Sequence, residues 1–66
     1  MINRLKVERA IKNITQEELA KEIGVSRQTI NAIELGKYVP STVLSLKIAR
    51  FFGRKMEEIF ELEEGD

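Results

Sequence analysis

Apolar residues recur along this chain at helical spacing, and turn-forming residues interrupt them at several points. Gly24, Gly36 and Gly53 each follow a helical pattern, at the place where a residue with positive φ commonly ends a helix. Pro40 then stops the chain before Ser41. These breaks divide the chain into five predicted helices, at about residues 4–12, 16–22, 27–35, 42–52 and 55–60. The pattern therefore predicts an all-α fold.

Polar residues at the predicted helix starts support these boundaries. Thr15 and Glu18 have the spacing of a capping box, in which the Thr15 hydroxyl and the Glu18 carboxylate each accept from the other residue's free backbone N–H. Ser26 and Ser41 can cap the next two helices through their hydroxyl oxygens, and Asn3 can cap the first. Four of the five helices therefore have a candidate N-cap.

The predicted core is made of apolar residues on one face of each helix. They are Leu19, Ala20, Ile23, Val25, Ile30, Ile33, Leu44, Ile48, Phe51, Phe52, Met56 and Ile59, with Phe60 as a further candidate. The helix at 4–12 lacks a clean apolar stripe, because Glu8 lies one turn beyond Leu5. Arg54 and Lys55 stand where Ser, Thr or Asp would cap the last helix, and their charge opposes the helix dipole. We favour chance placement on the surface for these two residues over a phosphate contact.

The two ends of the chain have a different pattern. Phe60 to Glu63 alternate between apolar and acidic residues, which suits a short half-buried strand better than a helix. The most accessible partner for that strand is the other extended end, Met1 to Asn3. We therefore expect a short antiparallel pairing of the termini, with frayed ends as the alternative.

Length and composition exclude several classes of function. The chain has 66 residues, which predicts one small soluble domain over residues 1–66. It contains neither Cys nor His, which excludes a zinc finger and thiol or imidazole catalysis. We expect no cofactor. An enzyme pocket would remove most of so small a core, and glutamates that are adjacent on a helix diverge by about 100°. No apolar run approaches the roughly 18 residues of a membrane span, so we expect a cytoplasmic protein.

Charge is balanced over the whole chain but unevenly distributed. Residues 1–55 hold all 11 basic and 5 of the 11 acidic side chains, a difference of +6, and residues 56–66 carry the opposite charge. A net charge of zero therefore does not exclude a polyanionic partner, because the local electrostatic field of one face is what attracts a phosphate backbone. The acidic end is either a solvated tail or a contact for another protein.

The helix at 27–35 has an unusual exposed face. At about 100° per residue, Ile30 and Ile33 fall on one side with Thr29, and the other side carries no carboxylate. That outer side consists of Arg27, Gln28, Asn31, Ala32 and Leu35. Arginine matches the O6 and N7 edge of guanine, the two amides match the N6 and N7 edge of adenine, and alanine can touch a thymine methyl. The face thus predicts reading of DNA bases, with an ordinary solvated face as the alternative.

The stretch from Thr15 to Glu34, followed by Gly36 to Ser41, resembles the Cro and phage-repressor family of helix-turn-helix transcription regulators. The resemblance covers nearly the whole chain. It implies a compact five-helix bundle of the lambda-repressor-like DNA-binding type. It also implies that the helix at 27–35 lies in the DNA major groove, with the protein acting as a homodimer on an inverted-repeat operator.

Site roles follow from the same resemblance. It implies that Gln16 holds a DNA phosphate, helped by the N-terminus of its helix. Arg27 and Gln28 would reach base edges, Asn31 would contact a base or the sugar-phosphate edge, and Ala32 would lie close to a methyl group of the groove.

Further roles lie outside the recognition helix. The resemblance implies that Lys37 neutralises a phosphate and that Tyr38 can do so through its hydroxyl, although packing within the loop explains Tyr38 equally well. It also implies a partly buried ion pair between Arg9 and Glu34, which would be structural.

One helix reads too few base pairs to select an operator in a genome, so we expect a homodimer. The nominated interface consists of apolar residues in the C-terminal part: Val43, Leu46, Met56, Ile59, Phe60 and Leu62. Ordinary core packing is the alternative for these residues.

The sequence thus predicts a sequence-specific regulator that binds double-stranded DNA, without a small-molecule effector. We expect repression, since the chain leaves no room for a sensor domain and binding alone can block a polymerase. The alternative is an antitoxin or adapter whose main partner is another protein.

Overall fold

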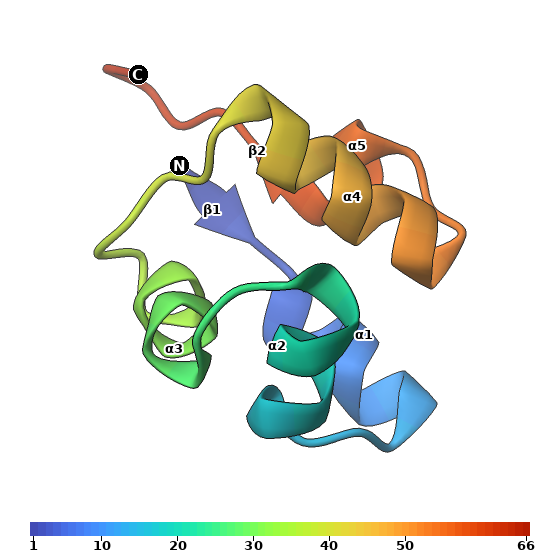
Figure 1. The fold of residues 1–66 in the computed structure, drawn as a ribbon. Coiled ribbons are helices and arrows are strands. Elements are labelled where there is room, and N and C mark those ends of the chain that lie inside the picture. Colours follow the sequence, from blue (N-terminus) through green and yellow to red (C-terminus); the bar gives the residue numbers. More distant parts are fainter.

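The computed structural model describes all of residues 1–66 and contains five helices and one two-stranded antiparallel sheet (Figure 1). In chain order the elements are β1 (Ile2–Asn3), α1 (Leu5–Lys12), α2 (Gln16–Ile23), α3 (Arg27–Glu34), α4 (Thr42–Phe52), α5 (Met56–Ile59) and β2 (Phe60–Glu61). The predicted helical bundle is therefore confirmed, with helix ends that differ by at most one residue. None of these helices combines the length and the apolar character needed to cross a bilayer.

Three of the predicted N-caps are present. The Thr15 hydroxyl accepts from the Glu18 N–H at 3.0 Å, and the Glu18 carboxylate accepts from the Thr15 N–H at 3.0 Å. Ser26 and Ser41 cap α3 and α4 through their side-chain oxygens. Asn3 belongs to β1, and the N-cap position of α1 falls on the next residue, so the predicted position was off by one. Asn3 Oδ1 nevertheless accepts from the Leu5 N–H, the first of α1, at 3.2 Å, and the Asn3 amide nitrogen donates to the Ile33 carbonyl at 2.8 Å.

Twelve buried apolar residues form one core between the helices. They are Leu5, Leu19, Ala20, Ile23, Ile30, Ile33, Leu44, Ile48, Ala49, Phe52, Ile59 and Phe60. Val25, Phe51 and Met56, which were also predicted to be core residues, are half-buried at its edge. The core therefore joins all five helices and the C-terminal strand.

Helix α1 turns a carboxylate toward the bundle. Glu8 is only 9% exposed, and its Oε1 accepts from the Arg54 Nε at 3.2 Å. The interpretation of Arg54 as a chance surface charge is therefore corrected, because it is the partner that this nearly buried carboxylate needs. Val7 and Ile11 lie on the solvent side of α1, which explains why no clean apolar stripe is visible in its sequence.

The termini pair as predicted. β1 and β2 are antiparallel, with Ile2 opposite Glu61 and Asn3 opposite Phe60, and both chain ends lie on the same side of the molecule (Figure 1). The pairing takes Phe60 into β2, and α5 is therefore shorter than predicted. Three acidic groups of the tail have intrachain partners: Glu61 contacts Arg4, and Glu63 and Asp66 contact the Met1 amino group.

Candidate nucleic-acid interface

A tight turn between α2 and α3 sets the direction of α3. The Ala20 carbonyl accepts from the N–H groups of Gly24 at 2.8 Å and Val25 at 3.0 Å. Gly24 has φ +86°, and a Cβ built there would meet no atom within 4 Å, so backbone conformation rather than space requires glycine. Ala20 is buried where the two helices pack. In Figure 1 α3 consequently lies at one side of the molecule, away from α4 and α5.

The two faces of α3 differ sharply in burial and charge. Ile30 and Ile33 are buried in the core. Arg27, Gln28 and Asn31 are exposed on the other face, with Ala32 half-buried. The one carboxylate of the helix, Glu34, is turned into the bundle with a side chain that is only 5% exposed. A polyanion would therefore meet guanidinium and amide groups on this face, without a repelling carboxylate.

Side chains of α2 and α3 converge on one polar groove. Gln16, from the first turn of α2, lines it together with Arg27, Gln28 and Asn31 of α3, and no hydrophobic residue contributes to the lining. A second groove runs alongside, from Gln16 and Arg27 toward the end of α1. It adds residues that the sequence had not indicated for this surface: Arg9, Asn13, Ile14, Thr15 and Glu17.

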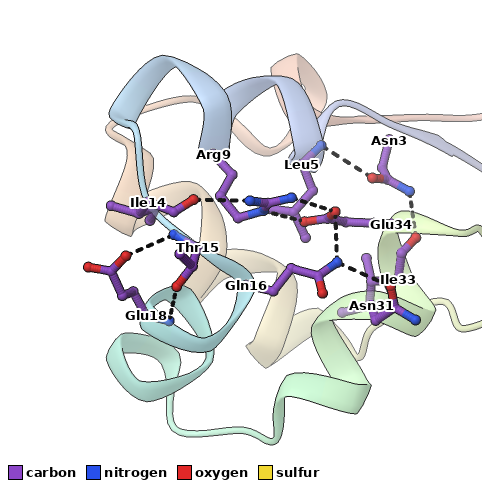
Figure 2. A network of polar contacts seen from close by, with 10 residues as sticks. All are labelled: Asn3, Leu5, Arg9, Ile14, Thr15, Gln16, Glu18, Asn31, Ile33 and Glu34. Atoms are coloured by element: carbon purple, nitrogen blue, oxygen red, sulfur yellow. Dashed lines mark hydrogen bonds and ion pairs between the residues drawn. The ribbon is translucent and has the colours of Figure 1, made fainter.

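Arg9, at the edge of the second groove, forms a bidentate ion pair with the nearly buried Glu34 (Figure 2). The Arg9 Nε donates to Glu34 Oε2 at 2.8 Å and its Nη2 donates to Oε1 at 3.1 Å. The remaining Arg9 nitrogen, Nη1, donates to the Ile14 carbonyl at 3.0 Å. Burial alone would raise the pKa of Glu34, but the hydrogen bonds from Arg9 and Gln16 outweigh it and hold this pKa below its ordinary value.

The Gln16 side chain is bonded within the protein. Its Nε2 donates to Glu34 Oε1 at 3.1 Å and to Asn31 Oδ1 at 3.1 Å (Figure 2). A phosphate oxygen is an acceptor, so in this arrangement the side chain has no hydrogen left for a phosphate. The backbone N–H groups of Gln16 and Glu17 at the start of α2 have no partner within the protein and could serve a phosphate in its place, whereas the Glu18 N–H is taken by Thr15.

The remaining nominated residues divide into exposed and buried ones. Lys37 and Tyr38 are exposed in the loop between α3 and α4. Val43 and Leu46 are exposed on α4, and Leu62, beyond β2, is 78% exposed. Met56 is half-buried.

Two of the nominated interface residues need a correction. Ile59 is 0% exposed and Phe60 is also buried, and both belong to the core of the chain itself. Their apolar side chains are therefore used within the monomer and are removed from the nominated interface.

Comparison with known proteins identifies the family. The helix-turn-helix family model matches residues 5–59. An uncharacterized HTH-type transcriptional regulator of Methanocaldococcus jannaschii is 61% identical over 66 residues, with both chains covered completely. YgzD of Bacillus subtilis, also an uncharacterized HTH-type transcriptional regulator, is 52% identical over 97% of each chain. A third, from Archaeoglobus fulgidus, is 55% identical over 97% of this chain and 90% of its own. This chain therefore belongs to the helix-turn-helix family of transcriptional regulators.

Proposed function

We propose that this protein regulates transcription by binding a specific double-stranded DNA sequence with α3 in the major groove. The observation that carries the proposal is the exposed face of α3, where Arg27, Gln28 and Asn31 share a polar groove with Gln16 and no carboxylate intervenes. A major groove about 12 Å wide admits one helix. The burial of Ile30 and Ile33 leaves the opposite face of α3 free to enter it.

Arg27 and Gln28 each have a chemical partner in that groove. The Arg27 fork matches the O6 and N7 acceptors of guanine, and the Gln28 amide matches the N6 and N7 edge of adenine. Lys37 lies beyond the end of α3 and would neutralise a phosphate, which gives affinity without sequence preference. Affinity and specificity thus come from different residues of one surface.

A homodimer on an inverted repeat is the second element of the proposal. Two recognition helices on one face of B-DNA lie about 34 Å apart, one turn of the duplex. The molecule measures 32 × 22 × 20 Å, so one copy with one α3 cannot fill two successive major grooves. The exposed apolar residues Val43, Leu46 and Leu62 are the candidates for contact between two copies.

Repression is the third element. A dimer that occupies two successive major grooves excludes a polymerase from the same duplex without any further contact. The alternative, an antitoxin or adapter that contacts another protein through its acidic C-terminal end, is less favoured. Three carboxylates of that end, Glu61, Glu63 and Asp66, are already paired within the chain.

Enrichment from a pool of random duplexes tests the proposal. The full chain should enrich an inverted repeat with half-sites about 10 base pairs apart. Arg27→Lys is a matched variant, because it keeps the charge but loses the guanidinium fork, and it should lose preference at one position of each half-site. Failure to enrich any sequence at low salt would overturn the proposed function.

A further inference from the structure

The ion pair behind α3 determines how the Gln16 amide must be oriented. An ionised carboxylate has only acceptor atoms, and Glu34 Oε1 lies 3.1 Å from the side-chain nitrogen of Gln16. The opposite orientation of the amide would place its oxygen against the carboxylate. Glu34 therefore fixes which end of the Gln16 amide faces the bundle.

The fixed Gln16 amide in turn orients Asn31. Gln16 Nε2 has two hydrogens, one directed to Glu34 and the other to Asn31 Oδ1 at 3.1 Å (Figure 2). Asn31 must meet this donor with its oxygen, which turns its own nitrogen away from Gln16. The one side-chain hydrogen bond of Asn31 within the protein is this one, through Oδ1, so Asn31 Nδ2 is left without an acceptor. The free end of the Asn31 side chain in the polar groove is consequently a donor with two hydrogens.

We infer that Gln16 is a positioning residue that makes Asn31 read guanine rather than adenine. The inference rests on the proposed function. Guanine presents two acceptors in the major groove, N7 and O6, which a free NH₂ group can bridge. Adenine pairs best with an asparagine that offers both its oxygen and its nitrogen, and here the oxygen is held by Gln16. The specificity of Asn31 is thus set from α2, through a side chain that need not touch a base.

Enrichment with variants of these two residues tests the inference. Asn31→Ala identifies the base pair that Asn31 faces, as the position where preference is lost. There the wild type should favour guanine over adenine by roughly 5-fold or more, the lower limit for a well-formed base contact. Gln16→Met lets the Asn31 amide rotate, and the preference should fall to within about twofold. Preference for adenine in the wild type, or unchanged preference for guanine in Gln16→Met, would overturn the inference.

Two further variants separate orientation from general damage. Asn31→Asp can still accept from Gln16 but presents an oxygen to the groove, so preference should move to the amino groups of adenine or cytosine. Gln28→Met replaces the amide at a neighbouring exposed position with an apolar side chain of similar size. It should change the base preference at a different base pair and leave the preference for guanine at the pair that Asn31 faces. If Asn31→Asp instead lost base preference to the same extent at every position of the site, the assigned orientation would be contradicted.

An NMR measurement on the free protein distinguishes the two possible failures. If the wild type enriches no duplex, the proposed function fails, but the orientation of the amides can still be measured. Side-chain hydrogens of Gln16 should exchange with water more slowly than those of Asn31, because only the Gln16 hydrogens are bonded within the protein. The reverse order would refute the inference whatever the DNA results.

Discussion

Glu34 connects three segments of the chain through one carboxylate. It accepts two hydrogen bonds from Arg9 of α1 and one from Gln16 of α2, while its own backbone ends α3. Arg9 and Glu34 have side chains that are 17% and 5% exposed, so little water is present to replace a lost partner. Removing one member of such a pair leaves an uncompensated charge in the bundle.

Glu34→Ala should therefore lower the free energy of unfolding by about 3 kcal/mol, the lower end of the range for breaking a buried pair. Urea titration at neutral pH measures this change. Glu22→Ala is a suitable control, because it removes an exposed carboxylate of α2 without a hydrogen-bond partner. Equal effects of the two substitutions would show that the pair contributes little to stability.

Acid should weaken the wild type more than Glu34→Gln. The folded protein holds the pKa of Glu34 below 4.5, its ordinary value, so this carboxyl stabilises the fold above that pH and loses its effect as the pH falls. A neutral amide takes up no proton and has no such dependence. Glu18 and Asp66, whose pKa values are also lowered, contribute equally to both proteins.

Urea titrations at pH 7, 5 and 3 measure this difference. Glu34→Gln should be less stable at pH 7, and the gap should narrow toward pH 3. A constant gap over this range would mean that the pKa of Glu34 is the same in the folded and unfolded states.

At the scale of helices, the sequence was most informative where the interactions are local. The Thr15 and Glu18 capping box and the Ser26 and Ser41 caps each join residues three apart, so a short window of sequence contains both partners. Gly24 ends α2 for an equally local reason, its positive φ. Helix starts and the exposed face of α3 could therefore be predicted.

Polar contacts between helices were not predictable from such windows, and the Arg9–Glu34 pair was expected only from the family resemblance. Glu8 and Arg54 are 46 residues apart, and Gln16 lies 15 residues from Asn31. Each residue taken alone looks like part of a solvated surface. The misassigned Arg54 and the unexpected bonding of Gln16 have this common cause, since only the packing of α1, α2, α3 and the start of α5 brings the partners together.

Arg54→Ala should lower the free energy of unfolding by about 1 kcal/mol, because α1 loses a contact with the start of α5. The loss is smaller than for a fully buried ion pair, since the Arg54 side chain is 45% exposed. The measurement is the midpoint of thermal or urea unfolding. Glu8→Gln in the same chain should recover part of the loss, because a neutral amide costs less to bury than an unpaired carboxylate. A double variant that is less stable than Arg54→Ala would contradict this explanation.

In the whole molecule, folding brings part of the acidic C-terminal end into contact with positive groups of the N-terminal end. The paired termini place part of the acidic tail beside Met1 and Arg4. The carboxylate-free face of α3 lies on a different element, at one side of the molecule (Figure 1). A chain without net charge can thus present both the face of α3 that we propose binds DNA and a mixed, internally paired end.

Leu46→Arg should convert the proposed dimer to monomers, because it places a charge among the exposed apolar residues of α4. Sedimentation measures the state of assembly directly. Val7→Arg is the matched control, since Val7 is equally an exposed apolar residue but lies on α1, outside the nominated interface. Monomers with both variants, or dimers with both, would remove α4 from the interface.

The most direct test of base reading by α3 is to measure affinity for the enriched operator and for every single base-pair replacement of it. The wild type should lose about 1–3 kcal/mol of binding free energy at each contacted pair. Gln28→Ala should lose discrimination at one pair in each half-site and keep it at the others. An unchanged pattern of discrimination in Gln28→Ala would contradict the account, because the exposed face of α3 would then not be what reads the DNA.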